Sequence, residues 1–198
     1  MLTYKHPKAK TCEVCERVFV PDRMGQLVCR PACAMARVRQ AKKAERASIK
    51  ARKEAIKTIA QLIADAQIAF NAFIRERDKG KGCFVCGRPF TDKPGQVQHA
   101  GHVRSRGAAG HLRFNEDNCH GECEGCIGPH GAKPHQIEAG AIARIGAERY
   151  AELCADNTPH KWQRDELIAI KHEYRAKLKD IQKGRIEMIE TILRGFGE

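Results

Sequence analysis

The amino-acid sequence predicts a mainly helical α+β protein in which two small cysteine-rich parts are held together by zinc. Helical periodicity runs through long stretches on both sides of the centre of the chain. Nine of the ten cysteines fall into two tight groups, Cys12 to Cys33 and Cys83 to Cys126. From Cys83 to about His135 the chain is rich in Gly, His, Cys and Pro, so we expect short strands and loops there. A core this poor in aliphatic side chains needs a metal to stabilise it.

The chain is strongly basic. Its 198 residues carry a formal net charge of +12, and its isoelectric point is about 9.4. Such an excess of positive charge favours a polyanionic partner, and DNA is the leading candidate. An acidic membrane surface is the alternative, but no run approaches the roughly 20 apolar residues that span a bilayer, so we expect no membrane partner. The first ten residues lack the apolar stretch of a signal peptide, which predicts a cytoplasmic protein.

The cysteine spacing predicts metal sites in preference to disulfides, because thiols stay reduced in the cytoplasm. In the first group, two residues separate Cys12 from Cys15 and three separate Cys29 from Cys33. Four thiolates at such spacing satisfy tetrahedral zinc and leave no coordination position open. We therefore predict a structural four-cysteine zinc finger over residues 1–33, which fixes the start of the helix that follows.

The second group offers more donors than one zinc ion can use. Cys83 with Cys86, and Cys123 with Cys126, repeat the same two-residue spacing. We assign these four to a second structural zinc. Cys119 is the alternative to either Cys123 or Cys126.

Residues 34–78 are predicted to form one long helix with two different halves. The first half, as far as Lys57, consists mainly of alanine and long basic side chains, without Gly or Pro. It has almost no apolar stripe, so we expect its cations to contact DNA phosphates, and we assign this role to Lys42, Lys43, Arg46 and Lys50. From Ile59 onward apolar residues recur at helical spacing and define a face of Ile59, Leu62, Ile63, Ala66 and Phe70.

That apolar face has two possible partners. It packs either against a second subunit, which would give a homodimer, or against a C-terminal helix of the same chain around Leu167, Ile170 and Tyr174. The C-terminal region, residues 136–198, is expected to hold two helices, from about Gln136 to Ala155 and from about Arg164 to Leu193. Cys154 stands apart from both cysteine groups, and we expect it to be a buried thiol.

Short motifs continue from the end of the long helix into the C-terminal region: Ala69 to Asp78, Ala100-Gly101-His102, Leu112 to Glu116, Asn118, His120, His160-Lys161-Trp162 and Ala169-Ile170-Lys171. Together with both cysteine groups, these motifs resemble the phage NinG family, also called Rap, over most of the chain. The resemblance implies a phage-encoded recombination nuclease that cuts branched DNA such as Holliday junctions and D-loops. It also implies an HNH-type (ββα-metal) core over residues 79–135 that uses Mg²⁺ or Mn²⁺.

The chemistry of a ββα-metal site fits particular residues of this centre. In such a site a histidine at the end of the first strand deprotonates water, and one divalent cation stabilises the charge that develops on the phosphate. His102 fits the base, because an imidazole titrates near neutral pH and Gly101 lets the backbone approach closely just before it. Asn118 fits the asparagine that holds the strand carrying the base. His99 occupies a position where the family pattern often has an aspartate, and we predict it as a ligand of the catalytic cation.

One position departs from the family pattern. The residue after the last zinc cysteine is often Asn or His and binds the catalytic cation, but here it is Ile127, which has no ligand atom. We predict that His130 takes over this role, with His120 or His135 as alternatives.

Three cations close to His102 in the sequence complete the predicted DNA contacts, namely Arg104, Arg106 and Arg113. The leading hypothesis is therefore a divalent-metal endonuclease for branched DNA. Two alternatives remain, a non-catalytic zinc protein that binds branched DNA and an HNH endonuclease that nicks ordinary duplex DNA. Only the family resemblance favours branched over linear DNA, because that choice depends on subunit geometry.

Overall fold

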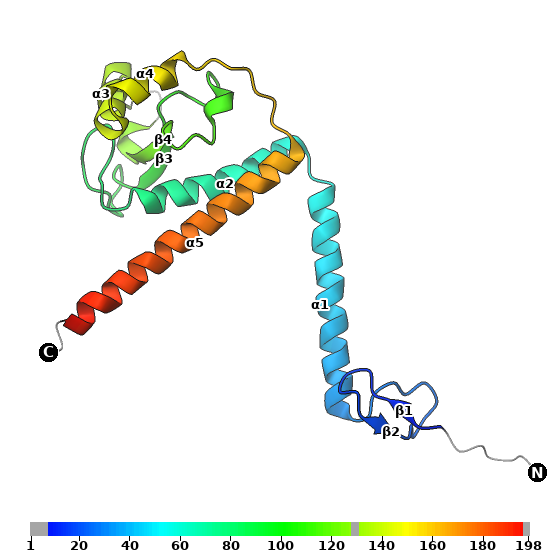
Figure 1. Cartoon of the computed structure of the whole chain (residues 1–198). Coiled ribbons are helices and arrows are strands. Elements are labelled where there is room, and N and C mark those ends of the chain that lie inside the picture. The colour runs from blue at the N-terminus through cyan, green and yellow to red at the C-terminus, as the bar shows by residue number, and fades with distance from the viewer. Residues whose placement is uncertain (1–7, 128–130, 196–198) are drawn as a thin grey trace, which may run out of the picture. The chain divides into compact units, whose positions relative to one another are not determined.

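The computed structural model describes residues 8–127 and 131–195 and divides the chain into two compact units, residues 1–57 and 58–198. The described residues form five α-helices and two sheets of two strands each, so the fold is the predicted mainly helical α+β type (Figure 1). Within those residues no helix is both long enough and apolar enough to cross a membrane. The predicted ligand His130 lies outside the described residues.

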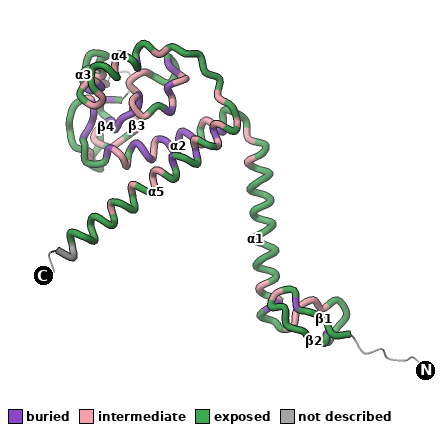
Figure 2. The backbone as a smooth tube through the Cα atoms, in the orientation of Figure 1, coloured by how far each residue is buried: buried purple, intermediate pink, exposed green. Residues whose placement is uncertain are grey.

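The N-terminal unit is a small cysteine-rich fold followed by one long helix. Strands β1 (Lys10–Thr11) and β2 (Val18–Phe19) pair antiparallel, and helix α1 spans Pro31–Ala55. Pro31 suits the first helical turn, because the N–H that it lacks would have no partner there. Cys33 is the only buried residue of α1, and Figure 2 shows the rest of the helix largely exposed. The expectation that this helix has no apolar face to bury is confirmed.

The predicted single helix over residues 34–78 is in fact two helices, α1 and α2 (Ile59–Arg77). Thr58 separates them by forming a capping box. Its hydroxyl accepts the Gln61 N–H at 3.3 Å, and its own N–H donates to Gln61 Oε1 at 2.9 Å. This reciprocal pair satisfies two backbone N–H groups at the start of α2, so a new helix begins without Gly or Pro.

The apolar face of α2 packs against α5 (Arg164–Gly195) of the same chain. Phe70 lies at the centre, with its ring edge-to-face with Tyr174 at 4.8 Å and with Phe114 at 5.8 Å between centroids. The buried core around it consists of Leu62, Ala66, Ala69, Phe73, Ile74, Cys119 and Leu167. The sequence left two possible partners for this face, a second subunit and the C-terminal helix, and the structure shows the C-terminal helix. Because α5 covers most of the face, little of it remains for contact with a second subunit.

A two-stranded antiparallel hairpin lies against α2 and joins this core. Strand β3 (Gln98–His102) pairs with β4 (Cys119–Cys123), so that Gln98 lies opposite Cys123 and His102 opposite Cys119. The loop between the strands contains the 3-10 helix η1 (Gly110–Leu112), and the 3-10 helix η2 (Glu124–Cys126) follows β4. Cys119 and Ala100 of the hairpin pack on the α2 core.

Two short helices follow the hairpin where the sequence predicted one. Helix α3 (Pro134–Ile145) ends at Gly146, which has φ = +86°, and α4 (Ala147–Ala155) begins directly after it. A positive φ is accessible to glycine at little cost, so Gly146 turns the chain between the two helices. Cys154 in α4 is exposed, so the expectation of a buried thiol is wrong.

Candidate metal centres and active site

The first cysteine group gathers its four sulfur atoms as predicted. The sulfurs of Cys12, Cys15, Cys29 and Cys33 all lie within 4.8 Å of one another. Cys29 Sγ is 3.5 Å from Cys15 Sγ and 3.8 Å from Cys33 Sγ. Zinc–sulfur bonds of about 2.3 Å in a tetrahedron place neighbouring sulfurs about 3.8 Å apart, whereas a disulfide needs about 2.05 Å. The spacing therefore fits a zinc ion and does not fit a disulfide.

The second group has the same geometry and settles which cysteines belong to it. The sulfurs of Cys83, Cys86, Cys123 and Cys126 also lie within 4.8 Å of one another, and Cys86 Sγ is 3.7 Å from Cys123 Sγ. Cys119 is not a member of the cluster. The four-cysteine assignment is confirmed as a set that fits zinc, and the alternative with Cys119 is excluded.

Both clusters contain the same tight turn after their first cysteine pair. The N–H of Glu16 donates to the Cys12 carbonyl at 3.0 Å, and the N–H of Gly87 donates to the Cys83 carbonyl at 2.9 Å. Glu16 and Gly87 both have positive φ, +58° and +72°. Glycine accepts this conformation freely, whereas a residue with a Cβ is strained in it. The N-terminal cluster therefore carries a local strain that the second cluster avoids.

His102 and Asn118 lie at one end of the hairpin, and the second cysteine cluster lies at the other end. His102 is the last residue of β3, and Asn118 immediately precedes β4. Asn118 is completely buried, and its side chain bonds only to backbone. Its Oδ1 accepts the Arg104 N–H at 2.8 Å, and its Nδ2 donates at 3.1 Å to the carbonyls of Arg104 and Leu112. Asn118 thus fixes the backbone that leaves His102.

His102 is mostly buried against the α2 core. Its Nε2 lies 3.0 Å from the Arg113 carbonyl oxygen, and its Nδ1 lies 3.8 Å from Cys119 Sγ. Because a carbonyl can only accept, Nε2 carries the proton and Nδ1 holds a lone pair in the neutral ring. Burial lowers the pKa of His102, and the nearby charges of Arg106 and Arg113 lower it further, although the Arg113 carbonyl acts in the opposite direction. The ring is therefore neutral at pH 7.

The structure does not bring the predicted catalytic residues into one cluster. His99 and His102 are three residues apart in β3, so their side chains point to opposite faces of the hairpin. His99 is exposed, whereas His120, an alternative ligand, is buried with Nε2 at 2.9 Å from the Asp117 carbonyl. His135, the other alternative, is an exposed residue of α3. Over residues 8–127 and 131–195, the two four-cysteine clusters are the only groups of three or more potential ligands within metal-binding distance.

The predicted DNA-contacting cations differ in how available they are. Arg104 is committed within the protein, because its guanidinium donates to the carbonyls of Leu153 and Asp156 and to Asn157 Oδ1. Arg113 is half-buried and donates to Gln67. The remaining predicted contacts are exposed, namely Arg106 and, on α1, Lys42, Lys43, Arg46 and Lys50.

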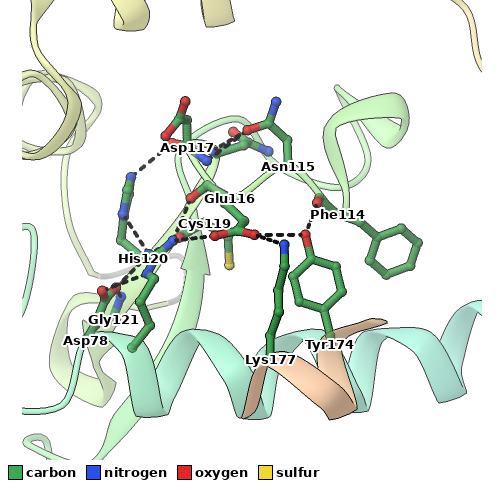
Figure 3. Close-up of polar contacts among 12 residues, drawn as sticks. Asp78, Phe114, Asn115, Glu116, Asp117, Cys119, His120, Gly121, Tyr174 and Lys177 are labelled. Atoms are coloured by element: carbon green, nitrogen blue, oxygen red, sulfur yellow. Dashed lines mark hydrogen bonds and ion pairs between the residues drawn. The ribbon is translucent and has the colours of Figure 1, made fainter. Parts of the chain in front are cut away.

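An ion pair that the sequence did not predict connects α2 to β4. The Arg77 guanidinium donates to both carboxylate oxygens of Asp78 at 2.9 Å and to the backbone carbonyls of Glu116 and Cys119. Asp78 Oδ2 accepts the Gly121 N–H at 2.7 Å, as Figure 3 shows. Burial would raise the pKa of Asp78, but the Arg77 guanidinium and the Gly121 N–H hold it at about 2. The pair therefore stabilises the fold fully at pH values above the ordinary carboxyl pKa of 3.8, and this contribution is lost as the pH falls from there through about 2.

Glu116 extends this network to α5. Its carboxylate accepts bonds from Lys177 at 2.7 Å and from the Tyr174 hydroxyl at 3.3 Å, and Figure 3 shows both contacts. The Tyr174 hydroxyl is also within 3.2 Å of the Phe114 carbonyl. Residues 113–118, which lead into β4, are thus held by both α2 and α5.

We predict that the chain purified under reducing conditions contains two tightly bound zinc ions. Four thiolates for each ion account for eight of the ten cysteines. Elemental analysis should give about one ion after Cys86→Ser and still two after Cys154→Ser, because Cys154 is an exposed thiol outside both clusters. One zinc ion in the unmodified chain, or disulfides in its mass spectrum, would contradict the assignment.

We further predict that Glu16→Gly stabilises the zinc-loaded chain by about 1 kcal/mol, because it relieves the left-handed backbone of the first turn. Gly87→Ala should destabilise by about the same amount, since a methyl group there meets no atom within 4 Å and only the backbone strain remains. Thermal unfolding measures both. Glu16→Ala is the control, because it removes the charge and keeps the Cβ. Equal stabilisation by Glu16→Ala and Glu16→Gly would show that charge, and not conformation, is responsible.

Comparison with known proteins assigns the chain to a family. The family described as "NinG: Bacteriophage Lambda NinG protein" matches residues 4–185. Protein ninG of Escherichia phage lambda is 35% identical over 204 residues, which cover 91% of this chain and 97% of that protein. Protein ninG of Salmonella phage P22 is 34% identical over 194 residues, which cover 88% and 94%. No solved structure matches the chain. The resemblance noted in its motifs is confirmed, and the chain belongs to the NinG family.

Proposed function

We propose that this NinG family member is a divalent-metal-dependent endonuclease that cuts branched DNA, such as Holliday junctions and D-loops, in the cytoplasm of the bacterial host. One observation above all supports the proposal. The β3–β4 hairpin has four cysteines at one end and, at the other, His102 with its backbone held by the buried Asn118. The strand, strand, helix order of β3, β4 and α3 is also that of a ββα-metal core.

His102 is the proposed general base. Its neutral ring has a lone pair on Nδ1, and a neutral imidazole can take a proton from the attacking water. Mg²⁺ or Mn²⁺ would stabilise the negative charge on the phosphate during hydrolysis. The proposal requires water to reach Nδ1, which faces Cys119 Sγ in the free protein. Catalytic contacts often tighten only when substrate binds, so this geometry is compatible with the role.

The remaining parts of the chain would support the binding of DNA. We propose that both four-cysteine clusters hold structural zinc and that the exposed cations of α1 track the phosphate backbone. We also propose a homodimer, because a four-way junction needs two symmetric cuts and a two-fold dimer supplies two sites. Since α5 covers most of the apolar face of α2, the subunits would meet through another surface.

A second candidate function is binding of branched DNA without cleavage. Ile127 favours it, because isoleucine cannot ligate the cation at the position after the last zinc cysteine. The third candidate function is the nicking of ordinary duplex DNA. Preferential cleavage of a four-way junction over a linear duplex would exclude it.

We predict that His102→Ala lowers the cleavage rate by about 100- to 10,000-fold and leaves junction binding nearly unchanged, because the side chain activates water and does not hold phosphate. The assay is labelled four-way junction beside a linear duplex of matched sequence, with and without Mg²⁺ or Mn²⁺. His172→Ala, which removes an exposed histidine of α5, is the control and should cut normally. Cleavage by His102→Ala at the normal rate would remove this residue from the mechanism. A zinc-loaded chain that binds the junction and never cuts it would favour the non-catalytic function.

We also predict that reversing the charges of Lys42, Lys43, Arg46 and Lys50 weakens binding to junction and duplex about equally. Phosphate contacts carry no shape information, so the slope of log affinity against log salt should shrink by about 0.9 for each duplex phosphate that is no longer neutralised. Reversal of Lys179 and Lys183, exposed on α5, is the matched control. A selective reduction of junction binding would mean that α1 recognises DNA shape.

A further inference from the structure

A basic pocket of about 180 Å³ lies beside the end of the hairpin that carries His102. Its walls come from the end of α2 and the turn after it, from the turn before β4, and from the junction of α3 and α4. The lining residues are Arg77, Asp78, Lys81, Asp117, His120, Arg144, Ile145 and Arg149. His120 lies opposite Gly101 in the strand register, and its side chain points away from the α2 face on which Cys119 packs.

Both carboxylates of the pocket are already paired within the protein. Asp78 is shared by Arg77 at 2.9 Å and Lys81 at 3.2 Å. Asp117 accepts a bond from Arg149. Neither carboxylate is therefore left to neutralise a further cation.

Arg144 is the fourth cation of the pocket. Its guanidinium donates to the backbone carbonyls of Lys81 at 3.1 Å and Gly82 at 2.6 Å. Within residues 8–127 and 131–195 it forms no ion pair with a carboxylate. Four cations facing two carboxylates leave the pocket with a formal excess charge of +2.

His120 forms a buried wall of the pocket and adds no charge to it. Its Nε2 donates to the Asp117 carbonyl at 2.9 Å, and its Nδ1 lies 3.2 Å from an Arg77 nitrogen (Figure 3). Burial and the charge of Arg77 lower the pKa of His120 to about 4, although Asp78 acts in the opposite direction. The ring is therefore neutral at pH 7, and guanidinium and ammonium groups carry all of the excess charge.

We propose that this pocket binds one phosphate group. Guanidinium groups offer the paired N–H donors that match phosphate oxygens. Lys81 and Arg149 have side chains that are 52% and 61% exposed, so they can meet a phosphate that arrives from solvent. The volume is several times the roughly 30 Å³ that one water molecule occupies in the liquid, which leaves room for the phosphate oxygens. An anion would also relieve the repulsion among the four cations.

In a nuclease this phosphate would belong to the DNA backbone. The pocket and the His102 side chain lie on opposite faces of the same hairpin end, so the pocket would hold a phosphate other than the one that is cut. Phosphate contacts position DNA without reading its sequence. The assignment to DNA rests on the proposed function, whereas the binding of a phosphate group does not, because free inorganic phosphate has the same chemistry.

The first test is a titration of the full zinc-loaded chain with inorganic phosphate, followed by ³¹P nuclear magnetic resonance. Salt at about 150 mM screens weak contacts with other exposed cations. We expect the double variant Lys81→Gln, Arg149→Gln to bind phosphate at least fivefold more weakly than the unmodified chain. The matched control is Arg175→Gln, Lys179→Gln, which removes two exposed cations from α5 and should bind normally. Two zinc ions per chain and an unchanged circular dichroism spectrum would show that each variant is folded.

Asp117→Asn is the sharper variant, because it should strengthen binding. It removes a negative charge from the pocket and frees Arg149 for phosphate, while the backbone carbonyl that holds His120 remains. We expect at least twofold tighter phosphate binding, which a folding defect could not produce. Asp180→Asn, which changes an exposed carboxylate of α5, is the control for net charge and should have no effect.

The second test is binding of a labelled four-way junction without divalent cations, so that no DNA is cut. We expect the Lys81→Gln, Arg149→Gln variant to bind the junction at least fivefold more weakly than its control. The slope of log affinity against log salt should shrink by about 0.9, as expected for one duplex phosphate.

The outcomes separate this inference from the proposed function. Phosphate affinities within twofold of the controls for both pocket variants, or no phosphate site in the unmodified chain, would overturn the inference. If phosphate binding depends on Lys81 and Arg149 but junction binding follows the control, the pocket takes free phosphate and its role with DNA is wrong. If the pocket binds phosphate and the unmodified chain binds no DNA, the pocket remains and the proposed function fails.

Discussion

The candidate site depends on the cluster of Cys83, Cys86, Cys123 and Cys126, which joins the turn before β3 to the end of β4. Two strands of five residues are marginally stable by themselves in water. Structural zinc can supply what is missing, since its apparent binding free energy in zinc-finger peptides is about 10–16 kcal/mol near neutral pH. Cys123 lies at the end of β4 opposite Gln98, so the cluster anchors this end of the hairpin.

Helix α2 supplies the second support at the other end of the hairpin. The Arg77–Asp78 pair holds the backbone of β4, and the core around Phe70 packs against Cys119 and Ala100. The hairpin is therefore held by sulfur at one end and by a helix at the other.

The sequence predicted the features that depend on local spacing. Both cysteine sets and the helical character of the flanking regions were predicted correctly, because ligand spacing and periodicity are local signals. The two-helix structure of residues 34–78 was missed, although Thr58 and Gln61 have the spacing of a capping box. Other features depend on strand register and tertiary contacts, which no local pattern determines. They are the hydrogen bonds of Arg104 to backbone carbonyls, the opposite faces of His99 and His102, and the position of Glu122 against Gly101.

If the second cysteine cluster, with its zinc, holds the hairpin in place, the hairpin should open when that zinc is removed. Amide hydrogen exchange tests this most directly by comparing the zinc-loaded chain with a Cys83→Ser, Cys86→Ser variant. We expect the amides of β3 and β4 to lose protection in the variant, whereas those of α2 and α5 around Phe70 stay protected, because their packing does not involve these cysteines. A hairpin that keeps its full protection without the second zinc would contradict this role of the cluster.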